Sequence, residues 1–184
     1  MSNKYYQIED DLSIENRWMV GELNLPVSFA WDDIESKSLI DAVNWKINVL
    51  LKGDPLDVTV IDFGLLMVKK SFIHLLPANE IDYKQIKIKN DKGGDIFYLL
   101  AVKNIIECVD RNKSEYTLWE DGNDIRPDLA GKYKSIYKLR INYKKVTPFS
   151  ILIVKEYKFF RIVSKEVKEQ FEKQKLKGIT FIEV

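Results

Sequence analysis

Residues 96–102, IFYLLAV, form an uninterrupted apolar run that is the strongest signal for the fold. A strand with both faces buried loses the usual alternation of apolar and polar residues, so this run indicates a central strand. The glycine pair 93–94 before it favours a turn. Before that turn, residues 86–89, IKIK, alternate as a strand with one buried face does. We therefore expect a sheet with residues 96–102 near its centre.

Further strand patterns lie on both sides of this centre. They cover residues 5–8, 56–61, 115–119, 136–141 and 149–154. The apolar residues of 72–76 recur at helical spacing, and Pro77 is expected to end that helix. A short helix is also expected near 36–43. The predicted fold class is α+β, with a mostly antiparallel or mixed sheet and a few helices.

The C-terminal part predicts a strand, a helix and a strand. Residues 158–163 lead into a helix from about Ser164 to Lys177, with Ser164 as its N-cap and Gly178 placed to stop it. Residues 179–184 form the closing strand. An offset of 95 residues aligns this region with residues 68–86, because Val68 then falls on Val163. An internal strand-helix-strand duplication and a chance similarity both explain the match.

At 184 residues the chain is expected to form a single domain over 1–184. An alternative adds a less regular N-terminal lobe over about residues 1–54. No apolar run approaches the roughly 20 residues of a membrane-spanning helix, and the first residues carry no secretory signal pattern. The expected location is the cytoplasm.

Motifs of enzyme chemistry are missing from the sequence. It contains no nucleophile elbow, phosphate-binding loop or dinucleotide fingerprint. Cys108 and His74 are the single cysteine and the single histidine, and both lie among apolar residues that predict burial. We expect no cofactor, no catalytic residue and no enzyme activity.

A binding surface is the remaining hypothesis, since tryptophan and charge often anchor protein interfaces. Residues 1–67 carry 12 acidic and 5 basic residues, a balance of 5 − 12 = −7, and the other residues balance at +8. An acidic patch from residues 1–67 is therefore expected to face a basic partner. The candidate partner-binding residues are Trp18, Trp31, Asp32, Asp33, Trp119, Glu120, Asp121 and Asp124.

Two other functions stay open at this point. Carboxylates near Asp121 and Asp124 could hold a divalent metal in an enzyme, although their spacing does not match a calcium loop and favours a solvated turn. The basic second half could bind nucleic acid, because tyrosines are interleaved with basic residues there. The residues concerned are Lys132, Tyr133, Lys134, Tyr137, Lys138, Arg140, Tyr143, Lys144 and Lys145.

Several segments taken in order resemble immunity protein family 11 of bacterial polymorphic toxin systems, first described as a domain of unknown function. The matching residues are Tyr5-Tyr6, Asn16-Arg17-Trp18, Gly21, Pro55-Leu56-Asp57, Asp62-Phe63-Gly64, Val68, Phe72, Tyr98-Leu99-Leu100, Cys108-Val109-Asp110, Ser114, Phe160-Arg161-Ile162-Val163-Ser164 and Gly178-Ile179-Thr180-Phe181. This resemblance implies a cytoplasmic antitoxin that binds and neutralises a cognate toxin protein. It brings no catalytic residues, and a fold-level likeness leaves the contact surface undefined.

Overall fold

The apolar run forms strand β7 (Phe97–Val102), which lies inside a six-stranded sheet. The structure is a computed structural model that describes residues 4–24, 45–89, 94–122 and 126–184. Alternate residues of β7 enter two different cores: Leu99 and Ala101 face one, and Leu100 and Val102 face the other. Burial on both faces is the reason why this strand is apolar throughout.

The sheet around β7 has the order β2-β3-β6-β7-β5-β4 among the described residues. Its other members are β2 (Met19–Val20), β3 (Lys46–Leu51), β4 (Val58–Val60), β5 (Leu66–Lys69) and β6 (Ile81–Lys89). All neighbouring strands are antiparallel except β3 and β6, which are parallel. The sheet is therefore mixed.

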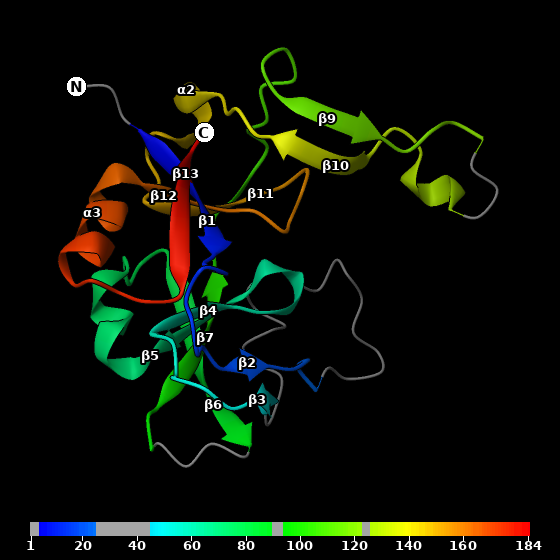
Figure 1. Cartoon of the computed structure of the whole chain (residues 1–184). Helices are drawn as coiled ribbons and strands as arrows, with labels where there is room; N and C mark the ends of the chain where they lie inside the picture. Colours follow the sequence, from blue (N-terminus) through cyan, green and yellow to red (C-terminus); the bar gives the residue numbers. More distant parts are fainter. Residues whose placement is uncertain (1–3, 25–44, 90–93, 123–125) are drawn as a thin grey trace.

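A second sheet has the order β13-β1-β12-β11-β8 in the described part of the chain. Its strands are β1 (Tyr5–Asp10), β8 (Ile105–Ile106), β11 (Ile151–Val154), β12 (Arg161–Ser164) and β13 (Ile179–Glu183). The N-terminal strand β1 pairs antiparallel with both β12 and β13, so it lies between two strands from the C-terminal end. Figure 1 shows blue β1 beside red β13.

The remaining elements are short. They are the hairpin strands β9 (Glu115–Leu118) and β10 (Tyr133–Lys138), the 3-10 helices η2 (Asp62–Gly64), η3 (Lys70–Leu75) and η4 (Pro127–Leu129), and the α-helices α2 (Tyr143–Val146) and α3 (Lys165–Lys173). The many strands in antiparallel and mixed sheets, with few helices, agree with the α+β expectation. Helix η3 and helix α3 contact one another and lie on the same side of the two sheets (Figure 1).

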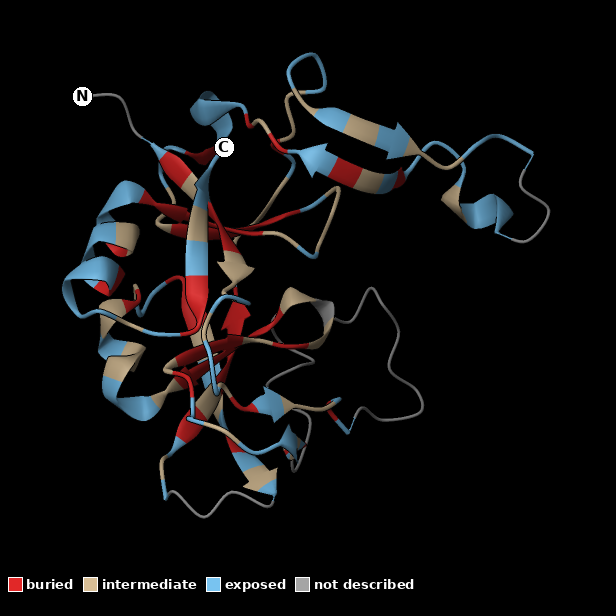
Figure 2. Ribbon diagram, viewed as in Figure 1, coloured by how far each residue is buried: buried red, intermediate tan, exposed pale blue. Residues whose placement is uncertain are grey.

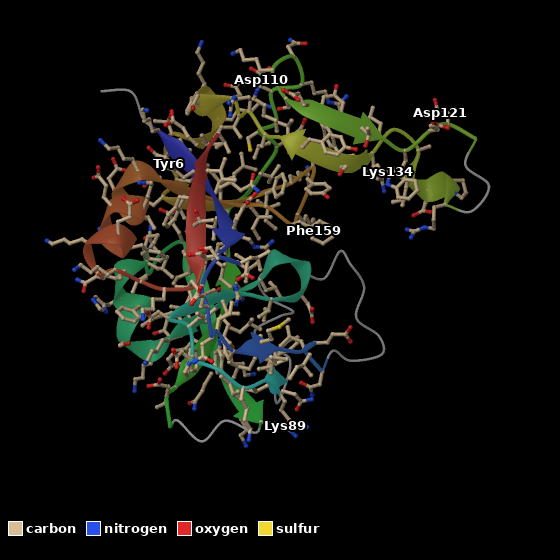
Figure 3. The ribbon with its side chains drawn as sticks, viewed as in Figure 1. Tyr6, Lys89, Asp110, Asp121, Lys134 and Phe159 are labelled. Carbon is tan, nitrogen blue, oxygen red and sulfur yellow. The ribbon has the colours of Figure 1, made fainter. Side chains whose placement is uncertain are left out.

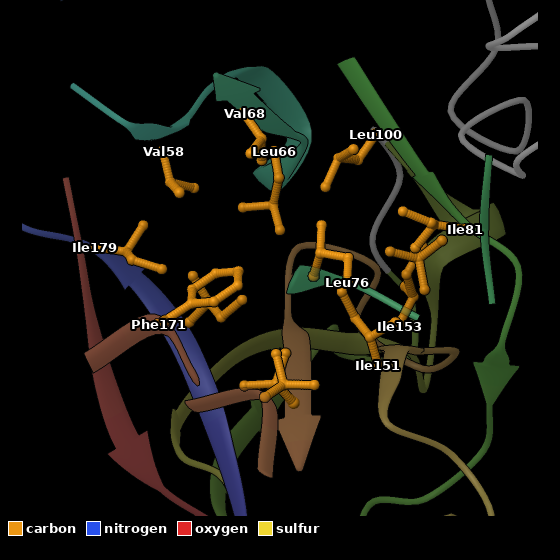
Figure 4. Close-up of a cluster of buried hydrophobic side chains, with 14 residues drawn as sticks. Val58, Leu66, Val68, Leu76, Ile81, Leu100, Ile151, Ile153, Phe171 and Ile179 are labelled. Atoms are coloured by element: carbon orange, nitrogen blue, oxygen red, sulfur yellow. The ribbon is translucent and has the colours of Figure 1, made fainter. Parts of the chain in front are cut away.

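Three apolar clusters hold these layers together, and Figure 2 shows the buried residues concentrated within the sheets. The first cluster fills the space between the two sheets under α3 and η3, with Val58 and Leu100 from one sheet and Ile153 and Ile179 from the other (Figure 4). The second cluster, around Trp18, covers the other face of the six-stranded sheet. The third packs the hairpin onto the other face of the five-stranded sheet.

Two helices differ from the sequence expectation. Residues 70–75 form a 3-10 helix and not an α-helix, and none of its residues is buried. Helix α3 ends at Lys173, four residues before the expected end at Lys177. The stop uses Lys175, which has a positive φ of 53° and donates from its N–H to the carbonyl of Glu172. The helix expected near residues 36–43 lies outside the described residues.

Gly178 therefore has a role other than the expected helix stop. A Cβ at this position would lie 1.9 Å from the carbonyl oxygen of Val58, and its φ is +116°. Glycine is required because β4 passes so close to the chain that enters β13. Ser164 does precede α3 as its N-cap residue, but its side chain makes no capping hydrogen bond.

Candidate functional site

The hairpin of β9 and β10 stands out from the body of the protein at the upper right of Figure 1. Its two strands form a separate sheet in the described structure. The inward side chains of β9, Tyr116 and Leu118, pack with Tyr133 and Ile136 of β10 in the third cluster. The rings of Tyr116 and Tyr133 meet edge to face at 4.9 Å. This apolar face anchors the hairpin, so its other face is left to solvent.

The outward face of the hairpin carries aromatic and charged side chains. Because strand residues alternate between faces, Thr117 and Trp119 point away from the core that holds Tyr116 and Leu118. The backbone of Trp119 extends the ladder beyond β9: its N–H donates to the carbonyl of Lys132 at 2.9 Å, and its carbonyl accepts from the N–H of Gly131 at 3.0 Å. Trp119 is therefore held at a defined position at the end of the hairpin.

A hollow with a volume of about 700 Å³ lies on this face. Two hollows elsewhere on the protein each have a volume of about 230 Å³. Its lining includes Trp119, Glu120, Asp121, Lys134 and Tyr137. Figure 3 places Lys134 and Asp121 at the same end of the hairpin. Tyr137 is 69% exposed, and Trp119 is half-buried. The hollow is lined by polar and aromatic groups that are open to solvent, which suits contact with another molecule.

Trp119 in the hollow already contacts a cationic side chain of the protein itself. The ammonium of Lys134 lies 5.1 Å from the centre of the Trp119 ring, within the range of a cation–π interaction. Nearby, the hydroxyls of Thr117 and Tyr137 lie 3.5 Å apart. At the other end of the hairpin, Lys138 forms a 3.1 Å ion pair with Glu115.

The predicted partner-binding residues have different surroundings in the structure. Trp119, Glu120 and Asp121 come together at the hollow, as adjacent residues must. Trp18 was wrongly predicted to be a contact residue, because it is 1% exposed and packs against Phe97 with ring centres 5.2 Å apart. It has no surface to offer a partner. Four other candidates, Trp31, Asp32, Asp33 and Asp124, lie outside the described residues.

Tyr137 and Lys134 line the hollow, and the sequence indicated them only in the nucleic-acid hypothesis. Tyr133, which has the same sequence surroundings, is buried, and its hydroxyl accepts a 3.0 Å hydrogen bond from Arg111. The hydroxyl of Tyr143 donates a hydrogen bond to the carbonyl oxygen of Val184. The tyrosines therefore do not form one stacking platform. The outward alternation of 117 and 119 was the signal that could have found this face.

Several acidic residues of the N-terminal part make internal contacts in the described structure. Asp10 pairs with Arg17 at 2.9 Å. Asp57 accepts from the N–H of Lys177 at 3.0 Å, and Asp62 accepts from the N–H of Leu23 at 2.9 Å. These three carboxylates have internal partners, but only Asp10 is neutralised by an ion pair, so the expected acidic patch stays a prediction. Four of the 12 acids, at 32, 33, 35 and 41, lie outside the described residues.

The Cys108–His74 pair does not form a catalytic site. Cys108 is buried in the third cluster, and burial raises the pKa of its thiol to about 12, which disfavours the thiolate needed for attack. His74 is exposed on η3, which packs against the six-stranded sheet. It does not lie in the apolar surroundings that the sequence predicted for it. The two side chains therefore belong to different parts of the molecule.

Metal-binding clusters and membrane-spanning helices are both missing from the described residues. Within residues 4–24, 45–89, 94–122 and 126–184, no group of three or more His, Cys, Asp or Glu side chains is arranged to hold a metal ion. Asp124 falls in a gap of this range, so a metal site that uses it stays a prediction. No helix in the described part of the chain is long and apolar enough to cross a membrane.

Comparison with known families identifies the class of protein. The Immunity protein family (Imm11) matches residues 49–184, which is more than half of the chain. The chain belongs to this family, as the sequence resemblance implied. The matched range includes the hairpin and its hollow. A search of curated proteins finds no match. Membership indicates an immunity function.

Proposed function

We propose that this protein neutralises a cognate toxin by direct contact in the cytoplasm, without catalysis, and that the outward face of the β9–β10 hairpin is its contact surface. The family supports the immunity role, and the observation that carries the choice of surface is the solvent-facing hollow with Trp119 and Tyr137 in its wall. Exposed aromatic side chains that bury a large area with little loss of entropy are the common anchors of protein interfaces.

The construction of the hairpin favours a binding role. Its inner face is attached to the third cluster, so the outer face is displayed in a defined geometry before any partner arrives. A preformed surface loses little conformational entropy on binding, and this raises affinity. A stable interface covers about 800 Å² of each partner. The hairpin face is therefore the anchor of a contact that extends onto neighbouring surface.

Co-expression tests this function. The toxin encoded beside this protein is produced in a sensitive host with the wild-type chain or with a Trp119→Ala, Tyr137→Ala variant. The wild type is expected to restore growth and to bind the purified toxin. The variant is expected to lose at least roughly 100-fold in affinity, because two aromatic anchors are removed. Both changes lie on the solvent side of the hairpin, so the thermal unfolding temperature should stay close to that of the wild type.

The matched control is the exposed pair at the other end of the hairpin. Glu115→Gln removes the ion pair with Lys138 and leaves the hollow intact. Affinity for the toxin is expected to stay within about threefold, since exposed ion pairs contribute little. Neutralisation by the aromatic double variant at wild-type affinity would refute the hairpin as the contact surface. Failure of the wild-type protein to bind or rescue would refute the function itself.

A further inference from the structure

The hollow on the hairpin combines two aromatic rings with two carboxylates. Trp119 and Tyr137 supply the rings, and Glu120 and Asp121, both exposed, supply the carboxylates. Among the residues that the structure describes, neither carboxylate takes part in an ion pair. Lys134 is the one basic residue of the described lining, so the formal charge of the hollow is 1 − 2 = −1. Aromatic faces next to free carboxylates attract cations.

The contact between Lys134 and Trp119 shows independently that the ring accepts a cation. The ammonium of Lys134 lies 5.1 Å from the ring centre, although the lysine side chain is exposed and could extend into solvent. Two other pairs of charges near the hairpin neutralise each other, Glu115 with Lys138 and Arg126 with Asp128 at 2.8 Å. The described lining of the hollow therefore keeps one negative charge in excess.

We propose that the hollow receives an arginine side chain from a loop of the toxin. The guanidinium stacks on Trp119 beside Tyr137 and forms ion pairs with Glu120 and Asp121, and the Lys134 ammonium moves away from the ring. Arginine fits better than lysine, because its planar group stacks on a ring while it hydrogen-bonds to carboxylates in its plane. This inference rests on the proposed function and adds the chemistry of the partner to it.

Displacing Lys134 is a small obstacle. A cation–π contact at an exposed position shifts an equilibrium by roughly two- to fivefold. The incoming guanidinium regains that contact and adds hydrogen bonds to two carboxylates that are without ion-pair partners among the described residues. Lys134 therefore keeps the ring covered in the free protein and gives way to a group with more contacts. Removing its charge is expected to strengthen binding.

The first test uses a small probe on the full-length protein. N-acetyl-arginine methylamide is titrated at low salt, with N-acetyl-citrulline methylamide as the uncharged control, and the indole N–H signal of Trp119 is followed by NMR. Trp119→Phe assigns the signal. The arginine probe is expected to shift it saturably and the citrulline probe to leave it in place. Equal shifts with both probes, or no shift with the arginine probe, would overturn the proposal.

Substitutions around the ring sharpen this test. Glu120→Gln with Asp121→Asn keeps the shape of the hollow and is expected to weaken arginine binding at least tenfold. Lys134→Gln is expected to strengthen it roughly two- to fivefold, because the competing ammonium is gone. Glu115→Gln, at the far end of the hairpin, should change nothing. Unchanged binding by the double amide variant would overturn the proposal.

The toxin complex separates this inference from the proposed function. If Trp119→Ala with Tyr137→Ala abolishes toxin binding, the hairpin is the contact surface. The Glu120→Gln, Asp121→Asn variant should then also bind at least tenfold more weakly, and its affinity should depend less on salt than that of the wild type. If the aromatic variant fails to bind while the amide variant keeps both affinity and salt dependence, the proposed function stands and the arginine site is refuted.

Discussion

Two regions of this protein share one pattern of strand pairing but complete it differently. The first unit consists of β4, β5, η3, β6 and β7, paired in the order β4-β5-β7-β6. The second unit consists of β11, β12, α3, β13 and β1, paired in the order β11-β12-β1-β13. In each unit a helical segment links two strands that flank one antiparallel strand. In the first unit η3 contacts β5 and β7, and in the second unit α3 contacts the corresponding strands β12 and β1.

The middle strand is what distinguishes the units. In the first unit it is β7, which follows β6 along the chain, whereas in the second it is β1 from the N-terminal end. Tyr5 of β1 pairs with Ser164, so this strand closes a loop of most of the chain. The family match begins at residue 49 and leaves β1 out. The five-stranded sheet is therefore completed by a strand that lies outside the matched range.

The offset of 95 residues seen in the sequence corresponds to this pairing pattern. Strand β5 (Leu66–Lys69) falls on β12 (Arg161–Ser164) without a gap, and η3 begins where α3 begins. The correspondence is one of topology, and an internal duplication stays a hypothesis. The units differ in their helices, because α3 buries Val167 and Phe171 in the first cluster, whereas η3 buries none of its own residues.

Removing β1 should break the second unit. Deletion of residues 1–10 takes away the strand that pairs with β12 and β13, together with the buried side chains of Tyr5 and Ile8. We expect the cooperative urea transition and the near-ultraviolet circular dichroism to be lost. The milder change Ile8→Ala should lower the free energy of unfolding by about 3 kcal/mol. Ile182→Ala, at a site 45% exposed on β13, should lower it by less than about 1 kcal/mol and is the control.

Survival of a wild-type unfolding transition in the deletion variant would mean that the second unit folds without its middle strand.

Gly178→Ala should disrupt the contact between the two units. The added Cβ would lie 1.9 Å from the carbonyl oxygen of Val58, so β4 and the chain entering β13 must move apart. We expect a loss of about 3 kcal/mol in urea unfolding, from overpacking and from the unfavourable φ together. Gly131→Ala separates the two causes, since Gly131 has a φ of +72° and open space around its Cβ position. It should cost about 1 kcal/mol. Equal losses of unfolding free energy in the two variants would mean that the close approach of the Val58 carbonyl to Gly178 contributes nothing.

Glu80 connects the two units through hydrogen bonds. It lies just before β6, and its carboxylate accepts from the N–H groups of Ser150 (2.9 Å) and Ile151 (3.1 Å) and from the amide of Asn104 (2.7 Å). Glu80→Ala should cost about 2 kcal/mol, because buried donors lose their acceptor. Asp82→Ala removes an exposed 2.9 Å pair with Lys103 and should cost less than about 1 kcal/mol. Chemical denaturation of both variants measures the difference, and similar losses would contradict a bridging role for Glu80.

The end of α3 offers a small stabilising change. Lys175 has a φ of 53°, and the N–H of Leu176 donates to the carbonyl of Phe171 in the turn that ends the helix. Glycine is favoured at such a position, so Lys175→Gly should raise the free energy of unfolding by about 0.5 kcal/mol. Lys173→Gly, at the last residue of the helix, should lower it by up to about 0.8 kcal/mol. A destabilising Lys175→Gly would indicate that the lysine side chain itself contributes to stability.

Local patterns were enough to predict part of this molecule. A central strand forms as expected, at Phe97–Val102 and so without residue 96 of the predicted run, because a strand buried on both faces has to be apolar. The approximate places of the hairpin, of α3 and of the closing strand follow from side-chain periodicity, which depends on backbone geometry within a few residues. Enzyme motifs could also be searched for in the sequence alone.

Exposure and long-range position depended on the folded chain. Tyr133 and Tyr137 have similar neighbours in sequence. Yet Tyr133 is buried on the inner face of the hairpin, whereas Tyr137 is 69% exposed at the hollow. Trp18 and Trp119 differ in the same way. Gly178 has its role because β4 passes beside it, and β1 is central because the two ends of the chain meet. These properties depend on which distant segments pack together, and a local pattern carries no information about its distant neighbours.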